Sequence, residues 1–271
     1  MFDVSNRKFN NLRDKLRAMG SVLIAFSGGV DSTFLLKVAH DVLGNKVLAV
    51  TAESETYPQT ELKEAKKLAR MVGANHQIIR TRELKKKNFS QNLPTRCYFC
   101  KRELFSDLKK IASRKKIKYV LDASNFDDLK DYRPGRRAAK ELGVKSPLAE
   151  AGLTKKEIRF FSRKMGLPTW SKPAQACLAS RIPYGESITK PKLTRIAKAE
   201  SFLRSLGIKI LRVRYHRNLA RIETVPDDLS LVLKYSSKVA KEFRKLGFNY
   251  VTLDLEGYRT GSLNEVLKLK K

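Results

Sequence analysis

The sequence predicts an α/β protein with a doubly wound, mostly parallel sheet, followed by a smaller C-terminal α+β domain. The first observation is an apolar run, Val22 to Phe26, typical of a parallel strand covered on both faces. The second is the alternation of strand and helix patterns between residues 22 and 80. The third is a change of pattern near Gly185. We therefore expect one domain at residues 1–185 and another at 186–271.

The elements of the first domain follow from spacing and from their stop signals. Apolar runs predict strands at 22–26, 46–51, 75–80 and 119–122. Helical spacing predicts helices at 6–19, 34–42, 61–72, 101–116 and 136–142, and a further helix begins after Thr154. Glu157, three residues after Thr154, completes the pattern of a capping box. This alternation predicts right-handed crossovers between parallel strands.

The second domain reads as α-β-β-α-β, after an irregular stretch at 172–189 that contains glycine and proline. The expected helices are 192–206 and 229–246, and the expected strands are 208–215, 219–225 and 250–255. Short strands joined in this way favour a small antiparallel α+β domain.

The stretch SGGVDS, from Ser27 to Ser32, follows the first strand and leads into a helix. Gly28 and Gly29 allow a tight turn that brings backbone N–H groups against a ligand. The N-terminus of the following helix and the hydroxyls of Ser27 and Ser32 point to an anion site. The P-loop pattern GxxxxGK[ST] is absent, so the phosphate grip of a kinase or GTPase is not expected.

SGGVDS resembles the PP-loop of the ATP pyrophosphatases, the superfamily of GMP synthetase, NAD synthetase and the tRNA-thiolating enzymes. The resemblance implies an adenine nucleotide alpha hydrolase-like fold that cuts ATP between its α- and β-phosphates and adenylates a substrate oxygen. Ser27, Gly28, Gly29 and Ser32 would bind the nucleotide, and Asp31 would help to hold Mg²⁺. Asn125, at the end of the fourth strand, is a further candidate for nucleotide or metal contact, although it suits a helix cap equally well.

The charge and composition limit the functional classes. Lysine and arginine number 57 against 27 acidic residues, a formal net charge of +30 that would attract a polyanion. The basic residues are spread along the chain without interleaved aromatics, which favours a solvated cationic surface over dedicated RNA binding. We expect a globular cytoplasmic protein, because the chain shows no apolar signal-peptide segment and no run long enough to cross a bilayer.

Three cysteines are present, Cys97 and Cys100 in a CxxC pattern and Cys177 downstream. CxxC is compatible with a redox pair, half of a zinc site or coincidence. Three thiolates on an iron-sulfur cluster would leave one iron open to substrate. The residues alone leave the cluster and ordinary buried thiols equally open.

The combination of SGGVDS, RCYFCK, ACLASR and IPYG resembles LarE, the sulfur transferase family that builds the nickel-pincer nucleotide cofactor. The resemblance implies that a carboxylate of a pyridinium dicarboxylate mononucleotide is adenylated and converted to a thiocarboxylate. Cys177 matches the sulfur-donating cysteine of members that sacrifice their own sulfur. Because Cys97 and Cys100 are also present, this chain is similar to the three-cysteine members, in which a 4Fe-4S cluster delivers sulfur from sulfide or another donor.

The same resemblance suggests the substrate contacts. Arg212 and Arg214 lie two residues apart on an expected strand, so both project to one face and could grip a phosphate. Arg181 and Glu200 match polar positions of the family's substrate site, and Ser180 is a neighbouring candidate. Family members form homo-oligomers, so we expect one here.

Three other functions remain as alternatives. A tRNA-thiolating enzyme would use the same ATP chemistry, but no RNA-binding module stands out. An amidotransferase-type synthetase would need a glutaminase half, which this sequence lacks. A non-catalytic nucleic-acid-binding protein on a degenerate nucleotide fold is disfavoured by the intact SGGVDS.

Overall fold

The structure is a computed structural model that describes residues 2–130, 134–173 and 176–267. The chain forms two compact units. The first contains Met1–Glu83 and Cys97–Gln175, and the second contains Leu84–Arg96 and Ala176–Lys271. These limits differ from the expected domains, 1–185 and 186–271, because segment 84–96 packs with the C-terminal part of the chain.

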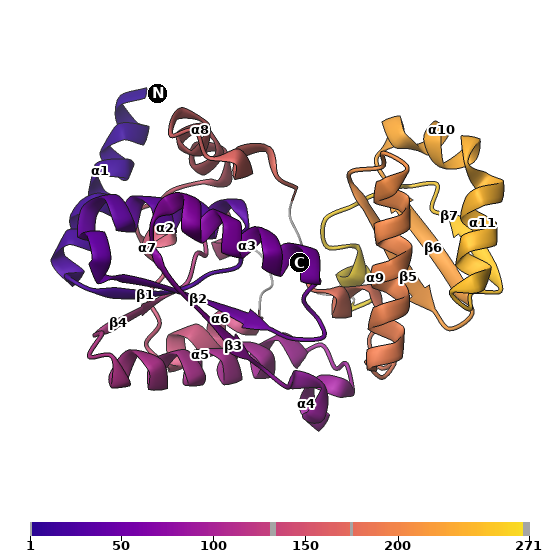
Figure 1. Ribbon diagram of the computed structural model, residues 1–271, viewed down its shortest axis with the longest axis horizontal. Helices are drawn as coiled ribbons and strands as arrows, with labels where there is room; N and C mark the ends of the chain where they lie inside the picture. Colours follow the sequence, from indigo (N-terminus) through magenta and orange to yellow (C-terminus); the bar gives the residue numbers. More distant parts are fainter. Residues whose placement is uncertain (1, 131–133, 174–175, 268–271) are drawn as a thin grey trace. The chain divides into compact units, whose positions relative to one another are not determined.

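The first unit is built on a four-stranded parallel sheet in the order β3-β2-β1-β4 (Figure 1). The strands are β1 (Val22–Ala25), β2 (Val47–Glu53), β3 (Asn75–Arg80) and β4 (Tyr119–Leu121). Val22 of the central strand lies opposite Val47 on one side and Tyr119 on the other. The predicted mostly parallel sheet is confirmed.

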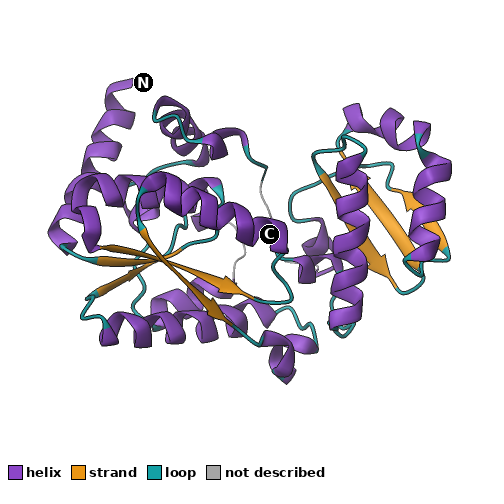
Figure 2. Cartoon of the chain, viewed as in Figure 1, coloured by secondary structure: helices purple, strands orange, loops and turns teal. Residues whose placement is uncertain are grey.

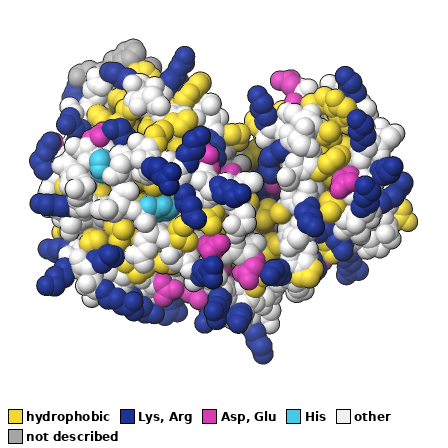
Figure 3. All heavy atoms as spheres, viewed as in Figure 1, with side chains coloured by type: hydrophobic (Ala, Val, Ile, Leu, Met, Phe, Trp, Pro, Cys, Tyr) yellow, Lys and Arg dark blue, Asp and Glu magenta, His cyan; other side chains and the backbone are white. Residues whose placement is uncertain are grey.

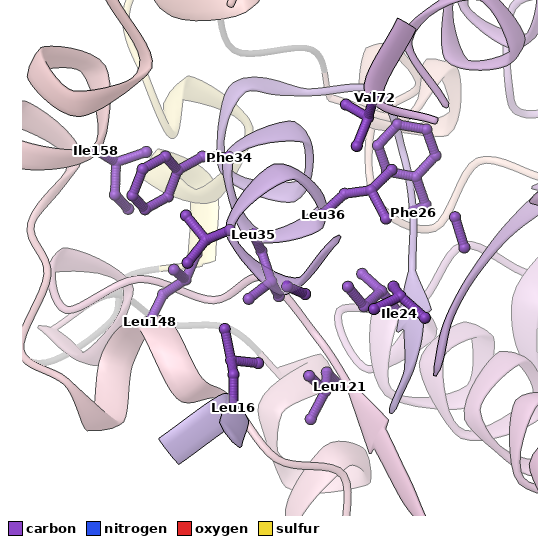
Figure 4. Close-up of a cluster of buried hydrophobic side chains, with 14 of the residues drawn as sticks. Leu16, Ile24, Phe26, Phe34, Leu35, Leu36, Val72, Leu121, Leu148 and Ile158 are labelled. Carbon is purple, nitrogen blue, oxygen red and sulfur yellow. The ribbon is translucent and has the colours of Figure 1, made fainter. Parts of the chain in front are cut away.

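Helices cover both faces of this sheet (Figure 2). Ile24 joins a core with Leu16 and Phe34 on one face, whereas its neighbour Leu23 joins Phe105 on the other. This alternation follows from the period of two along a strand. Figure 4 shows part of the first of these cores. The main helices of the unit are α1 (Phe2–Met19), α2 (Val30–Leu43), α3 (Gln59–Val72), α5 (Arg96–Arg114), α6 (Pro134–Glu141), α7 (Pro147–Glu150) and α8 (Lys155–Lys164).

The strand order places a topological switch point at the carboxyl ends of β1 and β4. The chain runs outward from β1 through β2 to β3 and then returns to place β4 on the other side of β1. Ligands of open α/β sheets bind where the order reverses in this way. SGGVDS follows β1 and Asn125 follows β4, so both lie at this edge.

The second unit holds a three-stranded sheet in the order β5-β6-β7. Its elements are α4 (Lys87–Ser90), α9 (Lys190–Ser205), β5 (Leu211–His216), β6 (Leu219–Thr224), α10 (Pro226–Lys234), α11 (Ser236–Lys245) and β7 (Tyr250–Leu253). The prediction of a purely antiparallel sheet is wrong, since β6 pairs with β7 in parallel. The two helices between these strands supply the long crossover that a parallel pair requires.

Other differences from the sequence predictions are local. The helix expected at 229–246 is two helices that meet at Tyr235. The helix expected from residue 101 begins at Arg96, so Cys97 and Cys100 lie within its first two turns and not before it. The capping box of Thr154 and Glu157 is present as predicted.

The surface is rich in lysine and arginine, which are spread over the face drawn in Figure 3. Within residues 2–130, 134–173 and 176–267, no helix is long and apolar enough to cross a membrane.

Candidate functional site

The loop after β1 has the backbone expected of a phosphate cradle. Gly28 has a positive φ of 67°, and a Cβ at this position would lie 3.2 Å from the Cα and Cβ of Ala65 on α3. Gly29, with φ of −78°, is the N-cap of α2 and carries no side chain that would satisfy the first amides of the helix. The N-terminus of α2 is therefore open to an anion.

The two serine hydroxyls of the loop lie together. The Oγ atoms of Ser27 and Ser32 are 3.1 Å apart, and the N–H of Ser27 donates to Ser32 Oγ over 3.3 Å. Ser32 Oγ also donates to the carbonyl of Gly29 over 3.1 Å. The predicted contacts Ser27, Gly28, Gly29 and Ser32 thus form one turn in which hydroxyls and amides gather.

Residues from outside the loop hold its carbonyls. The hydroxyl of Tyr57 donates to the Ser27 carbonyl over 2.5 Å, and Lys172 Nζ donates to the Gly28 carbonyl over 3.2 Å. Lys172 also forms an ion pair with Glu61 at 2.7 Å. Burial and the charge of Glu61 raise the pKa of Tyr57, which keeps its hydroxyl protonated as a donor.

Asp31, in the first turn of α2, receives contacts from two other segments. Asn125 Nδ2 donates to its Oδ1 over 3.2 Å. Lys155, the first residue of α8, donates from Nζ to its Oδ2. The exposed side-chain fractions are 21% for Asp31 and 31% for Lys155, so the ion pair is partly shielded from water.

Asn125 is held by the turn that follows β4. Its Oδ1 accepts from the N–H groups of Asp127 and Asp128, over 3.0 Å and 3.2 Å. Asn125 therefore caps the short helix after it, as one of the two predicted roles requires, and its amide also reaches Asp31.

The oxygen ligands at this edge suit Mg²⁺. Magnesium in nucleotide sites is usually held by one or two carboxylates together with phosphate oxygens and water. Asp31 supplies a carboxylate beside the open N-terminus of α2. The donor set therefore fits an ion held between Asp31 and a bound triphosphate.

The cysteines are divided between the two units. Cys97 is exposed and Cys100 partly exposed, one helical turn apart at the start of α5 in the first unit, and Cys177 is exposed in the second. Across the described part of the chain, no group of three or more His, Cys, Asp or Glu side chains is gathered in a way that could hold a metal ion.

Around Cys177, the second unit contains a buried ion pair. Arg181 Nε donates to Glu200 Oε1 over 2.7 Å, and both side chains are buried. Arg181 Nη1 also donates to the carbonyls of Ala176 and Cys177, over 2.8 Å and 3.3 Å. Burial acts to raise the pKa of Glu200, but the charge and hydrogen bonds of Arg181, together with Arg204 and the Val213 N–H, outweigh burial and lower the pKa. Arg181 therefore fixes the backbone that carries Cys177.

A second buried pair joins β5 to β6. Arg214 donates from Nε and Nη2 to the two carboxylate oxygens of Glu223, over 2.8 Å and 2.9 Å. Its Nη1 donates to the Ser180 carbonyl over 2.6 Å, and its Nη2 to Ser262 Oγ over 2.5 Å. All three nitrogen atoms of the Arg214 guanidinium therefore donate hydrogen bonds within the protein.

Arg212, two residues earlier on β5, has a different environment. Its Nη2 donates to the hydroxyl of Tyr258 over 3.0 Å, and its guanidinium lies 4.5 Å from the centre of that ring. Burial lowers the pKa of Arg212, and the positive charges of Arg214 and Arg181 lower it further. Within the described part of the chain, Arg212 makes no hydrogen bond or ion pair with a carboxylate, so an added anion would relieve this repulsion.

The structure thus brings Ser27, Gly28, Gly29, Asp31, Ser32 and Asn125 together in one unit, and Cys177, Ser180, Arg181, Glu200, Arg212 and Arg214 in the other. Sequence reasoning missed Tyr57, Lys155, Lys172, Tyr258 and Ser262. No local pattern identifies them, because each acts on a residue far away in the sequence.

Comparison with known proteins gives a consistent result. The family of the queuosine biosynthesis protein QueC matches residues 21–96, which include the SGGVDS loop. The pyridinium-3,5-bisthiocarboxylic acid mononucleotide synthase of Lactiplantibacillus plantarum is 40% identical over 253 residues, covering 93% of this chain and 92% of that protein.

Two uncharacterized proteins are also similar over nearly their whole length. One from Synechocystis is 48% identical and covers 96% of this chain and 98% of its own. One from Methanocaldococcus jannaschii is 32% identical, and the similarity covers 93% of this chain and 95% of that protein. With the PP-loop geometry described above, these similarities show that the chain belongs to the LarE family of ATP-dependent sulfur transferases, within the PP-loop superfamily.

Proposed function

We propose that this enzyme adenylates a carboxylate of a pyridinium dicarboxylate mononucleotide and converts it to a thiocarboxylate. The observation that carries the proposal is the loop of Ser27 to Ser32, whose amides and hydroxyls gather at the switch point of the sheet. It is supported by similarity over nearly the whole chain to the synthase that is named for a bisthiocarboxylic acid mononucleotide.

In the first step, a carboxylate oxygen of the substrate attacks the α-phosphorus of ATP. The bond from that phosphorus to the bridging oxygen breaks, and pyrophosphate leaves with its electron pair. The N-terminus of α2 and the hydroxyls of Ser27 and Ser32 stabilise the negative charge that develops there. Mg²⁺ bound at Asp31 would supply further neutralisation of that charge.

In the second step, a sulfur nucleophile attacks the acyl carbon and the bond to the AMP oxygen breaks. A carboxylate alone is a poor acyl donor because its leaving group would be oxide, whereas AMP leaves readily. The adenylation step therefore makes the sulfur transfer possible.

We assign the phosphate of the mononucleotide to Arg212. Glu200 is paired with Arg181 and Arg204, and Glu223 is paired with Arg214 and Arg221. Arg212 lies beside this cluster. The set therefore holds an excess positive charge, and Arg212 is the member without a carboxylate bond. A phosphate dianion would complement this charge.

We further propose that Cys97, Cys100 and Cys177 hold a 4Fe-4S cluster. Thiolates are the ligands that such clusters use, and two of these thiols lie one turn apart at the start of α5. When bound, the cluster would supply the sulfide for transfer.

Pyrophosphate release from ATP tests the reaction. We expect release to depend on the pyridinium dicarboxylate mononucleotide and not on transfer RNA, and mass spectrometry of the product to show oxygen replaced by sulfur. Release that transfer RNA stimulates and the mononucleotide does not would favour the thiolation of RNA instead.

The role of Arg212 is tested by Arg212→Ala and Arg212→Lys. We expect the alanine variant to raise the KM for the mononucleotide by roughly tenfold or more, with the KM for ATP unchanged. The lysine variant keeps the charge, so its KM for the mononucleotide should lie between those of the native enzyme and the alanine variant. An unchanged KM for the mononucleotide would contradict the assignment.

The cluster is tested by anaerobic purification with analysis of iron and acid-labile sulfide. We expect about four irons per chain, and loss of that iron on Cys97→Ala. A colourless protein that still forms the thiocarboxylate would sink the proposal and would indicate that Cys177 gives up its own sulfur.

A further inference from the structure

The ion pair between Lys155 and Asp31 occupies the position where a cation at the nucleotide site would be expected. Both oxygens of the Asp31 carboxylate are engaged, Oδ1 by Asn125 and Oδ2 by the ammonium of Lys155. The carboxylate to which we assign Mg²⁺ is thus already neutralised by a side chain of the enzyme.

The backbone of Lys155 is fixed by several bonds. Its N–H donates to Asp127 Oδ2 over 2.7 Å. The residue before it, Thr154, forms a capping box with Glu157, whose Oε2 accepts from the Thr154 N–H over 2.8 Å. Lys8 holds the other carboxylate oxygen of Glu157 at 2.9 Å. The base of the Lys155 side chain is therefore anchored, while its four-carbon stem remains able to turn.

The N-termini of α2 and α8 approach the same place. Asp31 lies in the first turn of α2 and Lys155 is the first residue of α8, and their side chains meet. A helix N-terminus attracts anions. The Lys155 ammonium therefore lies close to the place where the loop would hold phosphate.

A divalent cation and an ammonium cannot share one carboxylate without repelling each other. Mg²⁺ that enters with the nucleotide would take the Asp31 oxygen and displace the ammonium. The triphosphate brings more negative charge than Mg²⁺ neutralises, so phosphate oxygens offer the displaced group a new partner at short range.

We propose that Lys155 is a phosphate-binding residue that substitutes for the cation at Asp31 while the site is empty and moves to the phosphates when the magnesium nucleotide binds. When the bond between the α-phosphorus and the bridging oxygen breaks, the electron pair goes to the pyrophosphate. The ammonium of Lys155 then stabilises that leaving group without itself losing a proton. The proposal depends on the use of ATP and not on the identity of the acyl substrate.

The test is equilibrium ATP binding to Lys155→Met, measured with Mg²⁺ and with EDTA. Methionine keeps most of the stem and removes the charge. Without Mg²⁺, the uncompensated Asp31 faces the phosphates, so we expect ATP to bind roughly tenfold more weakly than to the native enzyme. With Mg²⁺, the ion neutralises Asp31 and only the lysine contact is lost, so we expect a loss of about threefold.

Lys156→Met is the matched control, because Lys156 is the next residue of the same helix and is exposed. We expect it to bind ATP like the native enzyme in both conditions. Lys155→Arg keeps the positive charge and should recover most of the binding in EDTA. Pyrophosphate release by Lys155→Met should fall by roughly 10²-fold, the effect of losing one group that stabilises a developing anion.

A purely structural ion pair would give a different result. Lys155→Met would then lower the melting temperature while its ATP affinity changed by the same factor with and without Mg²⁺, and either that equality or no change in affinity overturns the proposal. These outcomes concern ATP and Mg²⁺ alone, so they remain readable even if the mononucleotide proves not to be the substrate.

Discussion

Gly28 carries two separate constraints at one residue of the nucleotide loop. Its positive φ of 67° disfavours any residue with a Cβ, and that atom would lie tightly against α3, 3.2 Å from the Cα and Cβ of Ala65. The close approach of the loop to α3 therefore depends on glycine at this position.

We expect Gly28→Ala to weaken ATP binding at least tenfold and to lower the free energy of unfolding by about 2 kcal/mol. Calorimetric ATP titration and urea unfolding would measure the two effects. Gly20→Ala is the control, since Gly20 has a similar φ of 72° but nothing within 4 Å of the added Cβ. It should lose about 1 kcal/mol of stability and keep ATP binding. Equal ATP affinity in both variants would contradict the steric argument.

Glu157 shows how a cap can depend on pH. Its partial burial acts to raise the pKa, but hydrogen bonds from Thr154, Lys8 and Ser5 outweigh that effect and lower the pKa to about 2. The folded protein thus holds this carboxylate ionised at pH values where the unfolded chain protonates it, near 4.5. The stabilisation is present above pH 4.5 and is lost as the pH falls toward 2.

We expect Glu157→Ala to cost about 1 kcal/mol at pH 7, the usual effect of losing a helix cap. The difference from the native protein should shrink between pH 4.5 and 2, as the native carboxylate becomes protonated. Urea unfolding across this pH range would measure it. Asp107→Ala, which removes an acid from a surface pair with Lys110, serves as the control and should change stability by a few tenths of a kcal/mol. A difference that is constant with pH would show that the carboxylate charge is not the cause.

At the scale of elements, β5 and β6 are joined by more than their backbone bonds. The strands pair in antiparallel register, with Arg214 opposite Arg221 and Arg212 opposite Glu223. Glu223 is fully buried and accepts two bonds from Arg214. A charge in this position is tolerated only while its partner is present.

We expect Glu223→Ala to destabilise the second unit by about 3–5 kcal/mol, because it leaves the Arg214 charge buried and unpaired. Hydrogen exchange at residues 211–224 would report the loss, since it follows this unit separately from the other. Glu265→Ala is the comparison variant, because it removes an exposed partner of Arg259 and should cost less than about 1 kcal/mol. If the two variants exchanged alike, the buried pair would not stabilise the strands as described.

The first turn of α5 illustrates an element boundary that sequence patterns place poorly. The apolar stripe of the helix begins at Leu104, so the helix was expected from residue 101, but the helix itself begins at Arg96. Tyr98, buried and bonded to Glu141 over 2.6 Å, packs the extra turn. This tertiary contact stabilises the segment with both CxxC thiols as the start of the helix.

The net charge of +30 dominates the electrostatics of the protein. Lysine and arginine are spread over the face shown in Figure 3. Some basic side chains lie over aromatic rings, such as Arg137 over Tyr98 and Arg163 over Trp170. Such a surface attracts polyanions without distinguishing sequences.

We expect single-stranded RNA to bind weakly and to lose roughly 10³-fold in affinity between about 50 and 200 mM salt. Added RNA should not stimulate pyrophosphate release. Fluorescence anisotropy with two RNAs of unrelated sequence would check both the salt dependence and the lack of preference. Binding that resists salt and selects one sequence would point to a dedicated RNA site.

Much of the fold could be predicted because its signals are local. The strands β1 and β3 and the capping box at Thr154 depend on neighbours within a few residues. The parallel pairing of β6 and β7 could not be predicted, because strand direction depends on where the two intervening helices pack.

The nucleotide loop could be read from local sequence, because SGGVDS after an apolar run places glycines and hydroxyls at a strand-to-helix turn. Which side chains complete the site depends on how the elements pack. Lys155 reaches Asp31 across 124 residues, and Arg214 finds Glu223 on the neighbouring strand. A charged side chain takes whichever partner the packed elements bring within a few ångströms, and proximity of that kind leaves no trace in the order of the residues.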